Sequence, residues 1–166
     1  MILVRFFVII LLVVSCDQVS KLWILQNFDL YDSTVIIPGL FNLTFLRNTG
    51  VAFGIFAGHP SWWRQLFFIG VAVIALVVIL VFHRKLGRQN SLYTISLAFI
   101  GGGAVGNLID RVCYGSVVDF LDVYIGSHHW PAFNVADSAI AVGVAIFLIT
   151  QFQEERRVKR DQVSSG

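Results

Sequence analysis

Hydrophobic residues in this chain are gathered into four long runs that polar segments separate. The clearest run, Leu66–Phe82, extends for 17 residues without a charged side chain. Of the other three, one contains no charge, one contains only Asp137, and one contains Asp17 and Lys21. A membrane-spanning helix needs about 20 predominantly apolar residues, with a lower limit near 17. The pattern therefore predicts four transmembrane helices, at about 6–25, 65–83, 92–110 and 135–152.

The segment 26–64, between the first two predicted spans, has the pattern of a small β-sheet. Residues 35–37 and 41–45 flank the turn formed by Pro38-Gly39, and the alternation in the second of them is typical of a half-exposed strand. Residues 51–56 have the composition of a third strand. The predicted fold is mainly α: a polytopic membrane protein with four helices and a small sheet outside the bilayer.

Composition and charge support a membrane location and give it a direction. Hydrophobic residues make up 57% of the chain and charged residues 13%, against about 25% charged in a soluble domain. Basic residues prefer the cytoplasmic side, and eight of the 12 fall in the N-terminus, the loop 84–91 and the tail 154–166: Arg5, Arg84, Lys85, Arg88, Arg156, Arg157, Lys159 and Arg160. Residues 1–153 are thus predicted as one membrane domain with both termini cytoplasmic and segments 26–64 and 111–134 outside.

The remaining features change this picture little. Trp62 and Trp63 place residues 58–64 at the headgroup level, and the polar tail from Glu154 is expected to be frayed. The two cysteines, Cys16 and Cys113, are too few for a disulfide framework and are expected as free thiols. The net charge of +2 indicates no nucleic-acid partner.

The first run has a second interpretation, as a cleaved signal peptide or as the leader of a lipoprotein modified at Cys16. The sequence before Cys16 resembles a lipoprotein cleavage box, but Val14 is too large for its position. Apolar residues also resume at 22–25, and removal of the segment would leave three spans. We expect the segment to be retained, which the mass of the purified protein would test.

Several helices carry acidic residues to one level of the membrane. At about 1.5 Å of rise per residue, Asp17 lies about 18 Å, Asp110 about 28 Å and Asp137 about 22 Å from the cytoplasmic edge of a core about 30 Å thick. All three fall in the outer half, and Asp119 follows in the outer segment. Ionisable residues in a membrane indicate a functional site by default.

Structural roles are expected for some of these charges. Asp17 and Lys21 are four residues apart on a helix, so they can form an ion pair. Asp110 and Arg111 lie at a helix end, where Asp110 is expected to fix the outer segment to the bundle. Asp122 is expected in a loop. Small residues at 101–103, 106, 139, 141, 143 and 145 are expected to let helices approach closely.

Asp119 and Asp137 are the candidates for a catalytic pair. Asp119 lies among apolar residues, where a lone carboxylate is costly, and Asp137 lies in the first turn of a predicted helix. Two adjacent carboxylates do not both ionise easily, so one keeps a proton. The ionised one can then activate a water while the other protonates an amide carbonyl, as in aspartic proteases. From the residues alone, Asp122 stays open as the partner of Asp137.

Other hydrolytic designs are poorly supported by the sequence. There is no His-Glu-x-x-His motif and no Gly-x-Ser-x-Gly motif. His128 and His129 have no evident third ligand, so neither a metal nor another cofactor is expected. Ser20 and Lys21 are adjacent on a helix and point in different directions, which argues against a Ser/Lys dyad.

Five short blocks together resemble bacterial lipoprotein signal peptidase, the type II signal peptidase family. They occur in the family's order between about residues 15 and 150: Asp17-Gln18-Val19-Ser20-Lys21, Asn48-Thr49-Gly50-Val51-Ala52-Phe53, Gly106-Asn107-Leu108-Ile109-Asp110-Arg111, Val118-Asp119-Phe120 and Phe133-Asn134-Val135-Ala136-Asp137. Each block alone is weak, whereas five in order on a four-span pattern are highly specific.

The resemblance implies an aspartic endopeptidase of the bacterial inner membrane, with its active site toward the periplasm. It implies diacylglyceryl-prolipoproteins as substrates, cleavage before the lipidated cysteine, globomycin as inhibitor, and a periplasmic sheet with a short amphipathic helix. Asp119 and Asp137 match the family's catalytic pair, whereas Asp17 and Lys21 match structural residues. Positions tied to substrate binding or support of the site are matched by Asn48, Gly50, Asn107, Arg111 and Asn134.

Two further alternatives come from different functional classes. A small transporter or channel subunit could use Asp17, Asp110 and Asp137 along an ion path, but acids would then be spread through the whole membrane depth. An intramembrane protease of the presenilin type would carry a Gly-x-Gly-Asp signature, which is absent. The expected partners are therefore prolipoprotein substrates and membrane lipids, with the protein acting as a monomer.

Overall fold

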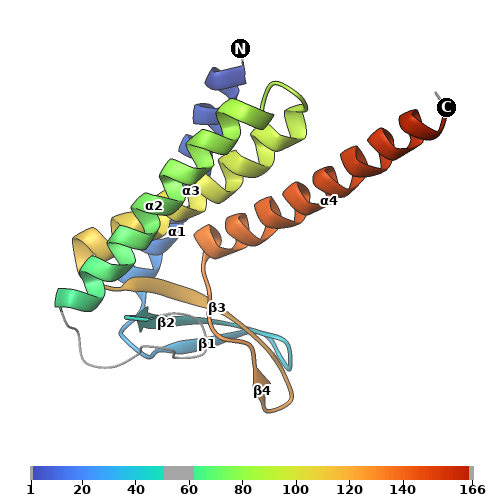
Figure 1. Cartoon of the computed structure of the whole chain (residues 1–166). Coiled ribbons are helices and arrows are strands. Elements are labelled where there is room, and N and C mark those ends of the chain that lie inside the picture. Colours follow the sequence, from blue (N-terminus) through green and yellow to red (C-terminus); the bar gives the residue numbers. More distant parts are fainter. Residues whose placement is uncertain (1, 51–61, 165–166) are drawn as a thin grey trace.

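The computed structural model describes residues 2–50 and 62–164 and consists of a helix bundle with a sheet at one end (Figure 1). The helices are α1 Ile2–Asn27, α2 Trp62–Leu86, α3 Ser91–Tyr114 and α4 Val135–Ser164. The strands are β1 Ser33–Ile37, β2 Phe41–Asn48, β3 Val117–Ile125 and β4 His128–His129, in the order β1-β2-β3-β4 with antiparallel neighbours. The predicted fold class is confirmed.

All four helices are long and apolar enough to cross a membrane. Helix α3 is the centre of the bundle. In its most apolar stretch of 18 residues, 56% are buried, against 11% in the corresponding stretches of α1 and of α2. It packs on α1, α2 and α4. The N-terminus, the α2–α3 turn and the C-terminus lie at one end and the sheet lies at the other (Figure 1), the arrangement that four spans require.

The predicted hairpin is present as β1 and β2, whereas β3 and β4 were not predicted. Strand β3 is buried along most of its length, and a strand buried on both faces lacks the alternation by which strands are found in sequence. The expectation that Asp122 lies in a loop is wrong, because it is part of β3. The proposed strand at 51–56 lies outside the described residues, and the described part of 26–64 holds no separate amphipathic helix.

Helices α2 and α4 extend further than the hydropathy indicated, α2 at both ends and α4 at its C-terminal end. Helix α2 begins at Trp62, so Trp62 and Trp63 form its exposed first turn. Helix α4 continues through the polar tail to Ser164, which corrects the expectation of a frayed tail. Hydropathy identifies only the apolar part of a helix, which lipid covers. Polar turns that continue the helix beyond the lipid are not detected by it.

A hydrophobic cluster joins the sheet to the bundle. Ile24 near the end of α1 packs with Phe45 of β2 and with Val118 and Phe120 of β3. All four side chains are at least 94% buried. The contact fixes β3 against the end of the helices, so residues on β3 have defined positions relative to residues on α3 and α4.

Glycines set the close approach of α3 and α4. A Cβ atom on Gly103 would fall inside contact distance of the Ala136 carbonyl oxygen, and a Cβ on Gly143 would lie 2.7 Å from the carbonyl oxygen of Ser96. Both clashes are with backbone, which cannot rotate away. The role predicted for small residues at these two positions is confirmed.

Gly143→Ala is expected to lower the free energy of unfolding by about 1–3 kcal/mol, the usual cost of overpacking. The helices must separate to admit the methyl group, since Ser96 offers a backbone atom there. Unfolding in detergent, followed by circular dichroism, measures the change. Gly70→Ala in α2 is the matched control, because its Cβ would meet nothing within 4 Å. Equal stability of the two variants would contradict the prediction.

Candidate active site

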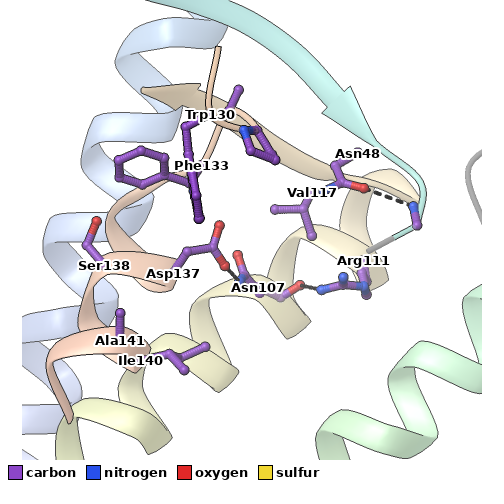
Figure 2. Close-up of a pocket in the computed structure, with 13 residues that line it drawn as sticks. Asn48, Asn107, Arg111, Val117, Trp130, Phe133, Asp137, Ser138, Ile140 and Ala141 are labelled. Atoms are coloured by element: carbon purple, nitrogen blue, oxygen red, sulfur yellow. Dashed lines mark hydrogen bonds between the residues drawn. The ribbon is translucent and has the colours of Figure 1, made fainter. Parts of the chain in front are cut away.

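A cavity of about 530 Å³ opens where α3 and α4 meet the sheet (Figure 2). One part of its lining is polar: Asn48, Gly50, Asn107, Arg111 and Asp137. The other part is largely apolar and comes from residues 130–133 and from α4, with Trp130, Phe133, Ile140 and Ala141 among its members. The cavity thus offers a carboxylate and amides on one side and an apolar wall on the other.

Asp137 is placed by the start of α4. Asn134 precedes the helix, and its Oδ1 accepts a hydrogen bond of 2.9 Å from the Asp137 backbone N–H, which is an N-cap contact. The Asp137 side chain accepts a hydrogen bond of 2.8 Å from Asn107 Nδ2 (Figure 2). The helix N-terminus also favours a negative charge at this position. Asp137 is therefore held with its carboxylate at the cavity.

Asp119 lies on β3 and is 3% exposed. Its two carboxylate oxygens accept hydrogen bonds from Asn134 Nδ2 at 2.7 Å and from Asn48 Nδ2 at 3.0 Å. Burial raises the pKa of Asp119 to about 7, and the nearby charge of Asp137 acts in the same direction, although the two amide hydrogen bonds oppose the shift. Asp119 itself does not line the cavity, whereas Asn48 does.

Two asparagines link the carboxylates. Asn134 Nδ2 lies 3.2 Å from Asn107 Oδ1 as well as bonding Asp119, and Asn107 Nδ2 bonds Asp137. A continuous chain of hydrogen bonds therefore runs from Asp119 to Asp137. Asn134 is fully buried, so it supports the site rather than facing the cavity. Asn107 reaches both the network and the cavity surface.

A buried ionic triad lies beneath the site. Lys21 Nζ is 2.8 Å from Asp17 and 2.9 Å from Asp110, and all three side chains are at least 98% buried. The predicted ion pair of Asp17 and Lys21 is thus present, and Lys21 forms a second ion pair with Asp110. Lys21 also donates to Asn107 Oδ1 at 3.0 Å. The triad therefore contacts the asparagine network directly.

The two acids of the triad hold the backbone next to the two candidate acids. Asp17 accepts a hydrogen bond of 2.9 Å from the N–H of Ala136, the residue before Asp137. Asp110 accepts one of 3.0 Å from the N–H of Val118, the residue before Asp119. The expectation that Asp110 fixes the outer segment to the bundle agrees with this contact.

Asn48, Gly50 and Arg111 form the polar rim of the cavity. Asn48 Oδ1 accepts a hydrogen bond of 3.0 Å from the Gly50 N–H, which orients its amide toward Asp119. The Arg111 guanidinium donates to the Asn107 carbonyl oxygen at 3.3 Å and lies over the Phe68 ring at 5.2 Å. Arg111 lines the cavity, and within residues 2–50 and 62–164 it has no carboxylate within ion-pair distance.

Asp122 is not brought together with Asp137. It lies three residues after Asp119, and successive side chains of a strand point to opposite faces. Its carboxylate accepts a hydrogen bond of 2.8 Å from Asn42 Nδ2 and contacts His129 Nδ1 at 2.8 Å. The question left open by the sequence is decided by geometry: Asp119 is the acid linked to Asp137.

Other sequence-based candidates fall outside the site. Ser20 Oγ donates to the Asp17 carbonyl oxygen at 2.8 Å, so it does not pair with Lys21. The described ranges contain no group of three or more residues able to hold a metal ion. The apolar wall formed by Trp130 and Phe133 was missed, and the only local signal for it was a tryptophan in an outer polar segment.

The fold and the site define an integral membrane protein in which two linked carboxylates, the buried Asp119 and the cavity-lining Asp137, lie at one end of a helix bundle. A family model described as signal peptidase (SPase) II matches residues 9–153. The chain belongs to this family of peptidases. The resemblance inferred from the five blocks is confirmed, and the transporter and presenilin-type alternatives are set aside.

Individual relatives and solved structures agree with this membership. The lipoprotein signal peptidase of Geobacter sulfurreducens is 53% identical over 141 residues, which cover 85% of this chain and 87% of the relative. That of Geobacter metallireducens is 48% identical over 145 residues, covering 87% and 88%. A bacterial membrane enzyme solved by the in meso method at 2.3 Å resolution is 35% identical, with a TM-score of 0.81 over 90% of this chain and 88% of that one.

Proposed function

We propose that this protein is an aspartic endopeptidase that removes signal peptides from diacylglyceryl-modified prolipoproteins. It cuts on the N-terminal side of the lipidated cysteine. The observation that carries the proposal is the hydrogen-bonded chain from Asp119 through Asn134 and Asn107 to Asp137 at the wall of a cavity. The names of the relatives, lipoprotein signal peptidases, support the substrate class.

The chemistry needs one proton shared by the two carboxylates. The ionised carboxylate removes a proton from a water molecule, whose oxygen attacks the scissile carbonyl carbon. The protonated carboxyl group donates its proton to the carbonyl oxygen, which gives a neutral tetrahedral intermediate. In the collapse of the intermediate the C–N bond breaks as the proton first taken from water is delivered to the leaving amine. One hydroxyl group of the intermediate returns its proton to the carboxylate that had donated, which restores the shared proton. No covalent enzyme intermediate forms.

The supporting residues divide the remaining work. Asn107 and Asn134 orient the two carboxylates by their hydrogen bonds. Asn48 and Gly50 line the rim of the cavity, and their proposed role is to bind the substrate backbone. The Arg111 charge stabilises the net negative charge of the pair. Asp17, Lys21 and Asp110 have a structural role beneath the site.

The membrane topology brings this site to its substrate. With the basic N-terminus, α2–α3 turn and tail in the cytoplasm, the sheet and the cavity lie on the periplasmic side of the inner membrane. The substrate signal helix and its lipid anchor occupy the same bilayer. The enzyme therefore meets the scissile bond as a monomer, among membrane lipids, without extracting the substrate. Globomycin is the expected inhibitor.

The proposal is tested by incubating the purified protein, in detergent, with a diacylglyceryl-modified prolipoprotein and measuring cleavage. Mass spectrometry should give a product that begins at the lipidated cysteine, and globomycin should prevent its formation. The same prolipoprotein without its lipid is the control and should remain uncut. Absence of cleavage by folded protein would reject the proposed function, and cleavage at another bond would reject the stated position.

The pH dependence of cleavage follows from the raised pKa of Asp119. A carboxyl group is protonated below its pKa, so a pKa of about 7 allows the pair to keep one proton near neutral pH. Above about 7 both carboxylates ionise, the proton donor is lost, and kcat/KM falls. At low pH the second carboxylate is protonated and the base is lost. Cleavage rates measured across pH on protein shown to stay folded would give this bell shape, and a rate that stays constant well above neutral pH would contradict it.

A further inference from the structure

Residues 126–133, here called the arm, carry one wall of the cavity. Trp130 and Phe133 line the cavity from this segment (Figure 2). Trp130 is 63% exposed. The position of this wall depends on what holds the arm to the rest of the sheet.

Backbone hydrogen bonds hold the arm mainly at its Phe133 end, and the part around β4 is attached by a short ladder. Strand β4 has only two residues, which pair with Tyr124 and Ile125. Beyond it, the Trp130 N–H donates to the Val123 carbonyl oxygen at 2.8 Å. Phe133 is anchored to Leu121 at the other end of the arm. Because β4 pairs with β3 over only two residues, a side-chain contact of β4 adds appreciably to its attachment.

The side chain of His129, on β4, attaches the arm further to β3. His129 Nδ1 contacts Asp122 Oδ1 at 2.8 Å, and its ring stacks on Tyr124 at 4.8 Å with an interplanar angle of 9°. Asp122 and Tyr124 are two residues apart on β3 and thus share one face. His129 is half-exposed, but its ring contacts both Asp122 and Tyr124.

The two partners of His129 are themselves held by the β1–β2 hairpin. Asp122 accepts a hydrogen bond of 2.8 Å from Asn42, its directly opposite neighbour on β2. The Tyr124 hydroxyl accepts one of 3.0 Å from the Gly39 N–H in the turn. The contacts of His129 therefore connect the arm, through β3, to the far strands of the sheet.

We propose that His129, held by Asp122, is a positioning residue that fixes the arm and so sets the affinity of the cavity for substrate. It does not touch the reacting atoms. It acts through Trp130, the next residue, which forms the apolar wall opposite Asn107 and Arg111. The inference rests on the proposed peptidase function and adds a determinant of substrate binding on the face of β3 that points away from Asp119.

The decisive variant is His129→Phe, which keeps a ring to stack on Tyr124 but removes the nitrogen that bonds Asp122. We expect KM for the lipidated prolipoprotein to rise about threefold to tenfold, the loss of one ordinary hydrogen bond at a half-exposed side chain, with kcat unchanged. His129→Asn should restore KM, because its Nδ2 donates from nearly the same place as Nδ1. His128→Phe, at the exposed neighbouring residue of β4, is the matched control.

Hydrogen exchange gives a readout that does not depend on cleavage. The amides of His129 and Trp130 should exchange faster in His129→Phe than in the wild type, and His129→Asn should restore their protection. Asp122→Ala should give the same rise in KM. If that variant fails to fold because Asn42 loses its partner, His129→Phe still carries the test.

Several results would overturn the proposal. They are an unchanged KM in His129→Phe, a fall in kcat alone, unchanged exchange in the arm, or an equal effect of His128→Phe. Failure of the wild type to cleave would reject the proposed function instead. In that case the exchange comparison alone still decides whether His129 holds the arm.

Discussion

Asp137→Asn and Asp119→Asn are each expected to reduce kcat for prolipoprotein cleavage by about a thousandfold or more, the scale of a lost general acid or base. Asparagine keeps the shape of the side chain but can neither take a proton from water nor share one with its partner. Each variant should remain folded, because the one oxygen of asparagine can still accept the hydrogen bond from Asn107 or Asn134. Asparagine at position 119 gives up only the hydrogen bond from Asn48. Steady-state cleavage of the lipidated substrate measures the effect.

Two other acids make this experiment specific. Asp29 is an exposed acid after α1, and Asp29→Asn should cleave as the wild type does. Asp122→Asn should retain kcat, because Asp122 bonds Asn42 and His129 on the other face of β3. If Asp122→Asn lost kcat while Asp119→Asn retained it, Asp122 and not Asp119 would be the catalytic partner of Asp137. The double variant Asp119→Asn/Asp137→Asn should be no slower than either single one, since the two residues act as a unit.

Lys21→Met is expected to lower the free energy of unfolding by about 3–5 kcal/mol, the usual result of removing one partner from a buried ion pair. The substitution leaves Asp17 and Asp110 as adjacent buried carboxylates with no cation between them. Unfolding of the purified protein by a denaturing detergent, followed by circular dichroism, measures the loss. Lys159→Met on the exposed end of α4 is the control for removal of a lysine.

The position of Lys21 adds a functional consequence. Asp17 and Asp110 hold the N–H groups of Ala136 and Val118, so a shift of either acid moves Asp137 or Asp119. We expect cleavage by Lys21→Met to be lower even where the protein is folded. Neutralising both acids together with Lys21 should recover part of the stability, because no unpaired charge then remains buried. Wild-type stability of Lys21→Met would contradict the structural role of the triad.

The sequence alone determined the features that local pattern controls. Four apolar runs of membrane length gave the helices, and the distribution of basic residues predicts their direction across the membrane. Pro38-Gly39 between short apolar segments gave the hairpin of β1 and β2. The spacing of Asp17 and Lys21 gave an ion pair, because four residues bring side chains to one face of a helix. Each of these depends on residues close together in the chain.

Membership of the signal peptidase II family was also accessible, since five blocks in a fixed order carry it. The blocks pointed to Asp119 and Asp137, and the apolar neighbours of Asp119 favoured it, but the residues themselves left Asp122 open as the alternative. The two acids lie only three residues apart in the same stretch. Only knowledge that this stretch is a strand, and of what each face meets, distinguishes them.

Tertiary structure decided the rest, because the decisive contacts join residues far apart in sequence. Asp119 meets Asn48 and Asn134, whereas Asp122 meets Asn42 and His129. Strand β3 is largely buried, so its sequence lacks the alternation that predicts a strand. Asp110, the second acid that pairs with Lys21, comes from another helix. Hydropathy and spacing determine which segments form helices and cross the membrane. The packing of the sheet on the bundle determines which carboxylates face one another.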